Sequence, residues 1–576
     1  MKKIKINVAG MTCEHCVTSV NKTLNKVKGV LEVNTSLTKG ESIILAQDEL
    51  KVEDIKKNLE NAGYRPLAHT LLDLSEGDKL KISNKLNNNA TNKPDENNQI
   101  NHAYNYDYDL IIIGGGSAAF SAAIKFAEKD KKVCVIENWV IGGTCLNRGC
   151  VPSKHLLEAA RIYYEPINNK FKGIETKQIA IDIKELISKK TELLNSLRQM
   201  KYYNVLEGYP DITFIEGTGR FSSKNSVEVI PNDKNIKPFK ITSGKFIIAT
   251  GSTNQIININ GLKDVGYITN EEILNINYLP KTLLILGTRA MGLEFAQMFS
   301  RFGSKVIIVG RSGRILLNEE PELSEELLDI LKKEGVEFLL NSHIKRLYKE
   351  NNKKYAEIET KEGLKTINFD EFLMATGIIG NTADLNLDIA EVETDKNGFI
   401  KVNDELMTTN KNIYACGNVT GKMPLVTTAA YDGKIASYNL LNENHLKVNY
   451  SGIAHTIFTD PEFSSVGLTE EIAIKEGYEI IKVVFPVKYV PKAQAIFKTE
   501  GLIKMIADKK TNKILGIHML SHNSCESIQQ ASVYIQNSYT IDTIGEEIGV
   551  YPTMAEGLKL AAQTFTKDVG KLSCCA

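Results

Sequence analysis

The chain of 576 residues has no excess of either charge, no long apolar stretch and no signal-peptide pattern at its start. Its 70 basic residues balance 70 acidic residues, so it has no general attraction to nucleic acid or to membrane surfaces. No apolar run approaches the ~18 residues that a membrane span requires. The first residues alternate apolar and polar side chains, which is typical of a strand. We therefore expect a soluble, cytoplasmic protein that neither binds nucleic acid nor inserts into a membrane.

The nine cysteines also lack the pattern of a disulfide scaffold. Six of them form three close pairs: Cys13 with Cys16, Cys145 with Cys150, and Cys574 with Cys575. Close pairs within an odd total indicate reactive thiols in a reducing compartment. The other three are single and lie in apolar patterns, so we predict a structural role for Cys134, Cys416 and Cys525.

A chain of this length is too long for one core, and three to four domains are expected. Residues 1–68 show the pattern of a ferredoxin-like βαββαβ domain. Its predicted strands are residues 3–9, 30–37, 42–47 and 64–68, and its predicted helices are residues 16–27 and 52–62. Residues 69–106 are rich in Asn, Lys, Asp and Glu, so we expect a flexible linker there.

Cys13 and Cys16 lie where the first strand passes into the first helix. A helix N-terminus lowers thiol pKa values, and two soft thiolate ligands suit Cu(I), Zn or Hg(II). A site with only two ligands is open, which favours passing an ion on over enclosing it. A thioredoxin-like redox pair is the alternative, but no thioredoxin-type pattern surrounds these residues. With its GMTCEHC and NAGY runs, the segment resembles heavy-metal-associated domains.

Two later segments have the strand, glycine-rich turn and helix of a dinucleotide-binding βαβ unit, namely residues 108–137 and 283–309. The first has Gly114, Gly116 and Ala119 at its turn, and Glu137 ends its second strand. Such glycines let the backbone approach a pyrophosphate at a helix N-terminus, and the acid can bond a ribose hydroxyl. The glycine pattern alone is a weak signal, and it gains weight because strand, helix and acid are in register.

The second unit has Gly287 and Gly292 at its turn, with Arg289 in place of the middle glycine. No acid ends its second strand, and Arg311 and Arg314 follow instead. Arginines can bind a 2′-phosphate that an acid would repel, so the sequence favours NADPH over NADH. The alternative is that both arginines are solvated loop charges.

Cys145 and Cys150 lie between these two units, on the first turns of a predicted helix that Gly142 and Gly143 precede. Sulfurs at i and i+5 on a helix can meet with slight distortion, and the helix dipole stabilises a thiolate. A buried apolar pair is the alternative for any two cysteines. A thiol pair between two dinucleotide folds nevertheless indicates electron flow from NADPH through a flavin to a disulfide.

The run GGTCLNRGCVPSK, after the first βαβ unit, resembles the active-site signature of the flavin disulfide oxidoreductases. The resemblance implies FAD and NADPH as cofactors, and a homodimer. It assigns residues 107–255 and 381–450 to FAD binding, 256–380 to NADPH binding and 451–576 to a dimerisation domain with a Cys-Cys tail. Together with the first segment, it predicts an α/β multidomain protein with two Rossmann-like domains and an α+β dimerisation domain.

The resemblance also implies which residues outside the two βαβ turns contact the cofactors. They are Gly143, Thr144, Lys154, Thr250, Gly251, Glu294, Gly377, Gly417 and Asn418. Lys154 is expected to neutralise charge near the flavin ring. Asn418 stands where the family has an Asp that bonds the ribityl chain, and an amide still offers an acceptor there.

The C-terminal end departs from the dithiol-reducing members of the family. In those members a His–Glu pair moves the proton of the substrate thiol, whereas here Glu556 is present and Tyr551 replaces the base. A phenol with a pKa of about 10 is a poor base at neutral pH, so dithiol chemistry is disfavoured. The terminal Cys574 and Cys575 are either accidental residues of a frayed tail or the ligands of a soft, linear ion.

The tail EGLKLAAQTF…LSCCA and the fused metal domain resemble those family members that reduce mercury. This resemblance implies NADPH-dependent reduction of Hg(II) to Hg(0), with thiol-bound Hg(II) as substrate and an active site shared across two subunits. It also implies a relay of the ion from Cys13 and Cys16, through the terminal cysteines of the partner subunit, to Cys145 and Cys150.

By the same resemblance, Cys150 is the thiol nearer the flavin and Cys145 the more accessible one, while Tyr202 and Tyr551 line the metal pocket. A packed or stacking tyrosine is an equal alternative for Tyr202, because Tyr203 adjoins it. Two other functions stay open. One is a disulfide reductase of the dihydrolipoamide or glutathione type with a metal-binding appendage, and the other is a metal-buffering protein whose flavoprotein body only keeps the thiols of residues 1–68 reduced.

Overall fold

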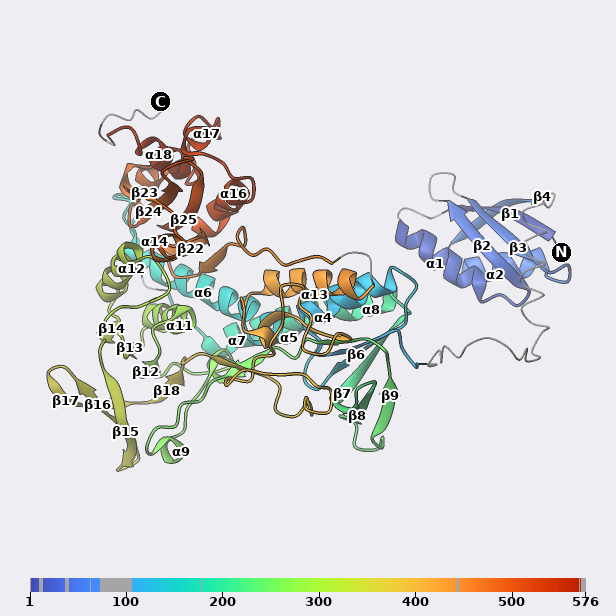
Figure 1. The fold of residues 1–576 in the computed structure, drawn as a ribbon, viewed down its shortest axis with the longest axis horizontal. Coiled ribbons are helices and arrows are strands. Elements are labelled where there is room, and N and C mark those ends of the chain that lie inside the picture. The colour runs from blue at the N-terminus through green and yellow to red at the C-terminus, as the bar shows by residue number, and fades with distance from the viewer. Residues whose placement is uncertain are drawn as a thin grey trace. The chain divides into compact units, whose positions relative to one another are not determined.

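The computed structural model describes residues 2–9, 14–36, 41–62, 64–72, 106–177, 179–441, 445–568 and 570. The chain divides into two compact units, residues 1–103 and 104–576 (Figure 1). No helix in the described part of the chain is both long and apolar enough to cross a bilayer.

The first unit is a four-stranded antiparallel sheet with two helices. In the order β2-β3-β1-β4, its strands are β2 (Val30–Ser36), β3 (Glu41–Ala46), β1 (Lys2–Ala9) and β4 (Arg65–Leu72), and its helices are α1 (Glu14–Asn25) and α2 (Val52–Asn61). The alternation along β1 puts Ile4 and Ile6 on one face, where they share a buried core with Leu24 of α1 and Ile55 of α2. The predicted ferredoxin-like βαββαβ order is confirmed.

The second unit contains a seven-stranded sheet with the order β20-β10-β5-β6-β7-β8-β9. Its strands are β20 (Ile413–Ala415), β10 (Phe246–Ile248), β5 (Leu110–Ile113), β6 (Val133–Glu137), β7 (Ile212–Ser223), β8 (Ser226–Pro231) and β9 (Phe239–Thr242). The first five pair in parallel, and β8 and β9 continue the sheet antiparallel. All four residues of β5 are buried, as expected for a parallel strand that is covered on both faces.

Helices α4 (Ser117–Ala127) and α13 (Val426–Leu440) run side by side against this sheet (Figure 1). They come close because Gly433 has no side chain: a Cβ there would lie 2.2 Å from the carbonyl oxygen of Ala118. Ser121 Oγ donates to the carbonyl of Ala430 at 2.7 Å across the same contact. The remaining helices of this part are α5 (Gly143–Arg148), α6 (Cys150–Tyr164), the 3-10 turns Glu165–Asn168 and Gly417–Thr420, α7 (Ile183–Arg198), the π-helix Gln199–Tyr203 and α8 (Asn204–Gly208).

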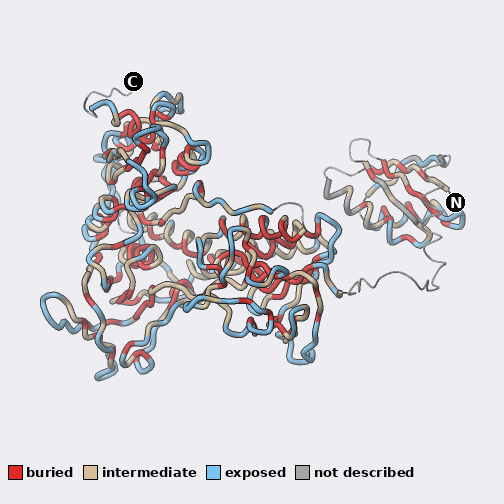
Figure 2. The backbone as a smooth tube through the Cα atoms, viewed as in Figure 1, coloured by how far each residue is buried: buried red, intermediate tan, exposed pale blue. Residues whose placement is uncertain are grey.

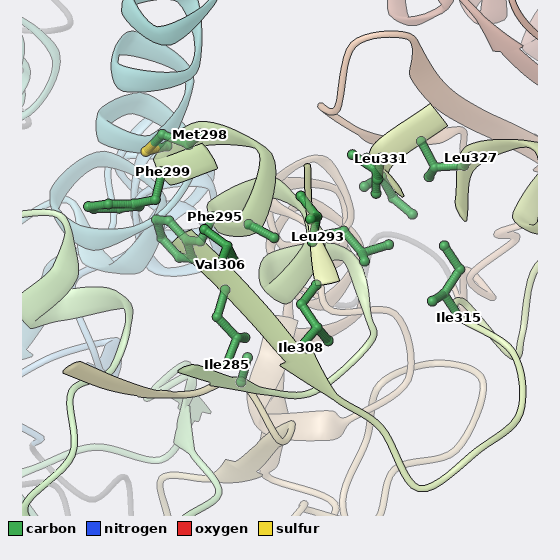
Figure 3. Close-up of a cluster of buried hydrophobic side chains, with 14 of the residues drawn as sticks. Ile285, Leu293, Phe295, Met298, Phe299, Val306, Ile308, Ile315, Leu327 and Leu331 are labelled. Atoms are coloured by element: carbon green, nitrogen blue, oxygen red, sulfur yellow. The ribbon is translucent and has the colours of Figure 1, made fainter. Parts of the chain in front are cut away.

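A second parallel sheet, of order β14-β13-β12-β18, carries the other βαβ unit. It contains β14 (Glu337–Leu339), β13 (Lys305–Val309), β12 (Thr282–Leu286) and β18 (Glu371–Met374), with helices α11 (Ala290–Arg301) and α12 (Pro321–Lys333). Phe295 and Phe299 of α11 pack with Ile285 of β12 and Ile308 of β13 in one buried cluster (Figure 3). Burial of each such side chain is worth about 1.5–3 kcal/mol, which holds the glycine turn before α11 against the sheet.

Shorter elements connect or extend this region. They are β11 (Ser252–Asn254) paired with β19 (Ile378–Gly380), α9 (Leu262–Val265), α10 (Asn270–Ile273), and a ribbon of β15 (His343–Glu350), β16 (Lys353–Thr360) and β17 (Gly363–Phe369). Figure 2 shows buried backbone in the sheets and in the helices packed on them, such as α4 and α13, while the outer part of the ribbon is exposed.

The last region is a five-stranded antiparallel sheet with helices. In sheet order its strands are β21 (His455–Ile457), β22 (Glu462–Gly467), β25 (Ile514–Ser521), β24 (Leu502–Asp508) and β23 (Ile480–Pro486). Its helices are α14 (Glu470–Lys475), the 3-10 turn Val487–Tyr489, α15 (Pro491–Ala495), α16 (Ser524–Gln536), α17 (Ile541–Gly545) and α18 (Glu556–Gln563). The predicted α/β multidomain class is confirmed, while the divisions at residues 255, 380 and 450 stay predictions.

The three single cysteines differ in their surroundings. Cys134 in β6 and Cys416 after β20 are buried, as predicted for structural residues. Cys525 on α16 is only half-buried, and its thiol donates to Glu462 at 3.3 Å.

Candidate active site

The turn between β5 and α4 has the form of a pyrophosphate cradle. Gly114 has a φ of +115°, and a Cβ there would lie 2.2 Å from the carbonyl oxygen of Ala249, so any other residue would force the backbone to shift. Glu137 ends β6 and accepts hydrogen bonds from the backbone N–H groups of Gly115 at 2.6 Å and Trp139 at 2.8 Å. The acid is therefore fixed beside the turn, with further lone pairs for a ribose hydroxyl.

A cavity of about 150 Å³ adjoins this turn and contains the predicted thiol pair. It is lined by residues from four separate stretches of sequence: Gly116 to Ala118, Gly142 to Cys150, Ala249 to Gly251, and Cys416 to Ala429. The structure thus brings together Gly116, Thr144, Gly251, Gly417 and Asn418, which sequence reasoning had assigned to the flavin. Glycine-lined backbone at a helix N-terminus suits a phosphate-bearing cofactor, so the residues present fit FAD.

Asn418 is held from the opposite side of this cavity. Its amide nitrogen donates to Ser252 Oγ at 3.2 Å, which leaves the amide oxygen as an acceptor for a ribityl hydroxyl. Thr250 Oγ1 donates to the carbonyl of Asn381 at 2.8 Å. The backbone N–H of Gln255 donates to the carbonyl of Gly377 at 2.9 Å, so the two strand-end turns are tied together through β11 and β19.

The thiol pair does not lie on one continuous helix, as the sequence had suggested. Cys145 lies within α5, and Cys150 is the first residue of α6, because Gly149 breaks the helix with φ −135° and ψ −114°. A side chain at Gly149 would come within 3.0 Å of the carbonyl oxygen of Thr144. The break places the Cys150 sulfur at the N-terminus of a 15-residue helix, where the helix dipole stabilises a thiolate.

The two thiols differ in charge and exposure. The pKa of Cys150 is lowered to about 7, first because Cys145 donates a hydrogen bond to its sulfur and also because the Lys154 ammonium is near. The pKa of Cys145 is raised by the same hydrogen bond and by burial. Cys150 is therefore the thiolate of the pair. In this single chain Cys150 is exposed and Cys145 half-buried, which is opposite to the expected order of accessibility.

Lys154 lies one turn after Cys150 and connects three parts of the chain. Its Nζ pairs with Glu294 of α11 at 3.0 Å and lies 4.2 Å from the ring centroid of Phe458. Glu294 also accepts from the backbone N–H of Phe458 at 2.9 Å. Sequence reasoning assigned Lys154 and Glu294 to the cofactor site separately and missed Phe458, for which the sequence has no local signal.

Tyr202 lies in the π-helix that ends α7, and π-helical turns are frequent at functional sites. Its ring meets Phe120 edge to face at a centroid distance of 4.8 Å, and its hydroxyl donates to the carbonyl of Gly142 at 3.5 Å. Burial raises the pKa of Tyr202, so the phenol stays protonated. Tyr202 therefore packs against Phe120, and the Gly142 contact places it at the loop that leads to Cys145. That it lines a metal pocket stays a prediction.

Two further residues of this loop were missed by sequence reasoning. Asn147 Nδ2 donates to the carbonyl of Gly143 at 2.9 Å, and Arg198 of α7 donates to Asn147 Oδ1 at 2.9 Å. These bonds fix α5 to α7 and hence fix the cysteine loop relative to Tyr202.

The second βαβ turn is as tightly constrained as the first. A Cβ on Gly287, which has a φ of +132°, would lie 2.1 Å from the carbonyl oxygen of Ala375, and a Cβ on Gly292 would lie 2.3 Å from that of Gly287. After β13, Arg311 is exposed and Arg314 donates to the carbonyl of Leu317 at 2.7 Å. The residues present therefore fit a nicotinamide dinucleotide, and the choice of NADPH over NADH stays a prediction.

Tyr551 and Glu556 are not among the residues that line the thiol cavity. Tyr551 is 53% exposed and follows Ile548 and Val550, which are 98% and 78% exposed. Glu556 begins α18; its Oε2 is buried without a hydrogen-bond partner among the described residues, and burial raises its pKa. Cys13, Cys574 and Cys575 lie outside the described residues, as does the side chain of Cys16. No group of three or more metal-binding side chains occurs in the described part of the chain.

Comparison with known proteins assigns families to three segments. The pyridine nucleotide-disulphide oxidoreductase family matches residues 108–433, its dimerisation domain matches residues 453–562, and the heavy-metal-associated domain matches residues 5–65. Mercuric reductase from Lysinibacillus sphaericus is 36% identical over 576 residues, with all of both chains covered. Mercuric reductase from Staphylococcus aureus is 36% identical over 572 residues, with 99% of each chain covered.

Among solved structures, the HOCl-induced flavoprotein disulfide reductase from Escherichia coli superposes with a TM-score of 0.71 at 30% identity. It covers 80% of this chain and 100% of its own. A Cu(II) complex of the same reductase superposes with a TM-score of 0.72. Both likenesses agree with the two dinucleotide sheets and the antiparallel sheet described above.

Proposed function

Because this chain belongs to the pyridine nucleotide-disulphide oxidoreductase family, we propose that it is a cytoplasmic enzyme that reduces Hg(II) to Hg(0) with NADPH. The observation that carries the proposal is the Cys145–Cys150 pair at the glycine-lined cavity, in a chain that aligns over its full length with mercuric reductases. NADPH gives up two electrons and leaves as NADP⁺ and a proton, and Hg(II) takes up the two electrons.

The two sulfurs supply the binding chemistry. Thiolates are soft ligands that prefer Hg(II) over harder ions, and the lowered pKa of Cys150, about 7, provides one thiolate at neutral pH. Cys145 loses its proton when the ion binds, since a thiol that binds a metal is deprotonated. Tyr202 keeps its hydroxyl neutral beside this loop, so it adds no competing charge. Hg(0) leaves because it binds thiolates poorly.

Cofactor binding is assigned to the two glycine turns. Gly114, Gly116 and Glu137 would hold FAD, Gly287 and Gly292 would hold the nicotinamide dinucleotide, and Arg311 would bind its 2′-phosphate. FAD supplies the relay that accepts electron pairs from NADPH and delivers them to the site of the thiol pair. Glu294 of α11, in the proposed nicotinamide-binding unit, holds the Lys154 ammonium group near Cys150.

The route of the ion is part of the proposal. Cys13 and Cys16 would capture Hg(II), and Cys574 and Cys575 of the second subunit would hand it to the thiol pair, since each exchange of sulfur for sulfur is nearly balanced in energy. The match of residues 453–562 to a dimerisation domain supports a homodimer. The exposed run with Ile548, Val550 and Tyr551 is the type of surface that a partner subunit covers, and it would bring Tyr551 and Glu556 to the partner's site.

The test is NADPH oxidation by the purified, flavin-loaded protein with Hg(II) in excess small thiol. Oxidised glutathione, lipoamide and Cu(II) are offered in parallel assays. The proposal expects mercury-dependent oxidation with release of volatile metal and little response to the disulfides. Turnover of a disulfide without turnover of mercury would contradict it and would make the chain a disulfide reductase. Turnover of neither, with Cu(I) bound by residues 1–68, would favour the metal-buffering function.

A further inference from the structure

A buried carboxylate lies behind the flavin-side turn and has no part in the chemistry above. Asp432 of α13 is 1% exposed. Its Oδ2 accepts a hydrogen bond from the backbone N–H of Gly417 at 3.1 Å, and its Oδ1 accepts one from the Tyr450 hydroxyl at 2.8 Å. The chain of bonds therefore runs from Tyr450, before β21, through α13 to the residue next to Asn418.

The turn at Gly417 depends on such support. Gly417 has a φ of +73°, and a Cβ there would lie 3.1 Å from Ala429 of α13 and 3.5 Å from Ala118 of α4. The turn thus sits in the narrow space between the two helices and has no side chain of its own at that point to anchor it. Its N–H group has to be satisfied because it is buried, and Asp432 supplies the acceptor.

The surroundings of Asp432 suit a carboxylate that accepts two bonds. Burial raises its pKa to about 6, so it is ionised at neutral pH, when both oxygens act as acceptors. Hydrogen bonds to a charged group are about twice as strong as neutral ones. The neighbouring Tyr431 meets the Tyr450 ring at a centroid distance of 6.3 Å, but its own hydroxyl accepts from the backbone of Asn449.

We propose that Asp432 and Tyr450 are positioning residues that hold the Gly417–Asn418 turn in the shape that binds FAD. Neither residue touches the flavin in this view; both act through the turn that presents the Asn418 amide oxygen. The amide oxygen of Asn418 binds a hydroxyl more weakly than a carboxylate oxygen would. Holding the Asn418 turn in its binding shape before FAD arrives reduces the entropy lost on binding, and so raises the affinity for FAD. The inference rests on the flavin binding of the proposed function and is independent of the metal.

The experiment compares FAD dissociation constants of the apoprotein, titrated by flavin fluorescence, for full-length variants. Asp432→Ala removes both bonds and should weaken FAD binding by about tenfold or more. Asp432→Asn keeps an oxygen for Gly417 N–H and offers its NH₂ to the Tyr450 oxygen, so it should stay within about threefold of wild type. Tyr450→Phe should fall between them.

Tyr431→Phe is the matched control, because it removes a hydroxyl from the same ring pair but not from the chain to Gly417. It should bind FAD as wild type does. Thermal unfolding of each apoprotein separates a loss of fold from a loss of positioning, and Tyr450→Phe keeps the test open if Asp432→Ala does not fold. Wild-type affinity in Tyr450→Phe and Asp432→Ala, or an equal loss in Tyr431→Phe, would overturn the inference. Failure of the wild type to bind FAD would instead defeat the proposed function.

Discussion

The two dinucleotide turns of this chain are built alike and differ at one end. Gly114 and Gly287 have φ values of +115° and +132°, and a Cβ on either would strike a carbonyl oxygen, of Ala249 or Ala375, at 2.2 or 2.1 Å. At the end of the second strand, however, Glu137 is fixed by two backbone N–H groups, whereas Arg311 is exposed on a loop. The common part suits what all dinucleotides share, and we expect the differing end to select among them.

The largest effect is expected from breaking the common part. Gly114→Ala should lower FAD affinity, and Gly287→Ala should lower NADPH affinity, by about 100-fold each, because overpacking and a positive φ together cost about 3 kcal/mol. Flavin absorbance and NADPH fluorescence titrations measure the two losses separately.

Gly303→Ala is the matched control for that pair. Gly303 has a φ of +101° but no atom within 4 Å of its Cβ position, so the substitution adds backbone strain without a collision. Cofactor affinities should remain close to wild type, with stability lower by about 1 kcal/mol. Equal losses of cofactor in all three variants would show that the collision is not what constrains the turns.

A smaller effect should come from the differing end of the nicotinamide unit. Arg311→Ala should raise the KM for NADPH by about tenfold and leave the KM for NADH unchanged, since only NADPH has the 2′-phosphate. Arg314→Ala should change the KM less, because Arg314 already donates to the carbonyl of Leu317. Steady-state kinetics with both nucleotides measures this. An equal rise for NADH would mean that Arg311 does not read the phosphate.

The corresponding change at the flavin end is Glu137→Gln. The amide keeps one acceptor oxygen but cannot serve the N–H groups of both Gly115 and Trp139, so FAD affinity should fall by about fivefold. Trp139 is the only tryptophan of the chain, and its fluorescence therefore reports on this turn during the titration. Unchanged affinity with changed fluorescence would show that Glu137 serves the turn alone, and no change in either would contradict the prediction.

The sequence predicted the local parts of this arrangement and not the long-range ones. Apolar strands, glycine spacing and a terminal acid or arginine are signals within about 30 residues, so both βαβ frames were found. The break at Gly149 is a local exception: it lies in the backbone angles of one residue, φ −135° and ψ −114°, which the Cys-x4-Cys spacing does not indicate. The Lys154–Glu294–Phe458 group joins segments 140 and 164 residues apart, and no local pattern indicates these partners. The Asp432–Tyr450 bond spans only 18 residues, but it joins a helix to a loop without a spacing motif that would predict it.

The Lys154–Glu294 pair links the helix that begins at Cys150 to the helix of the second dinucleotide turn. The two dinucleotide regions therefore meet next to the thiol pair. The pKa of Cys150, about 7, is lowered first by the hydrogen bond from Cys145 and further by Lys154. The alkylation rate of Cys150 in the reduced enzyme should therefore be half-maximal near pH 7, and it should fall below that pH as the thiolate is protonated. Cys145→Ala should move the midpoint toward higher pH by more than Lys154→Met does, because it removes the larger cause.

A Lys154→Met, Glu294→Gln double variant removes the charge without leaving a carboxylate unpaired, and so separates the field of Lys154 from damage to the α6–α11 contact. If the double variant restores the midpoint of the wild type, the shift in Lys154→Met came from the unpaired, buried carboxylate of Glu294. If it keeps the raised midpoint, the ammonium group itself stabilises the Cys150 thiolate. The second result would show that loss of the Lys154 charge, and not the unpaired Glu294 carboxylate, raises the pKa of Cys150.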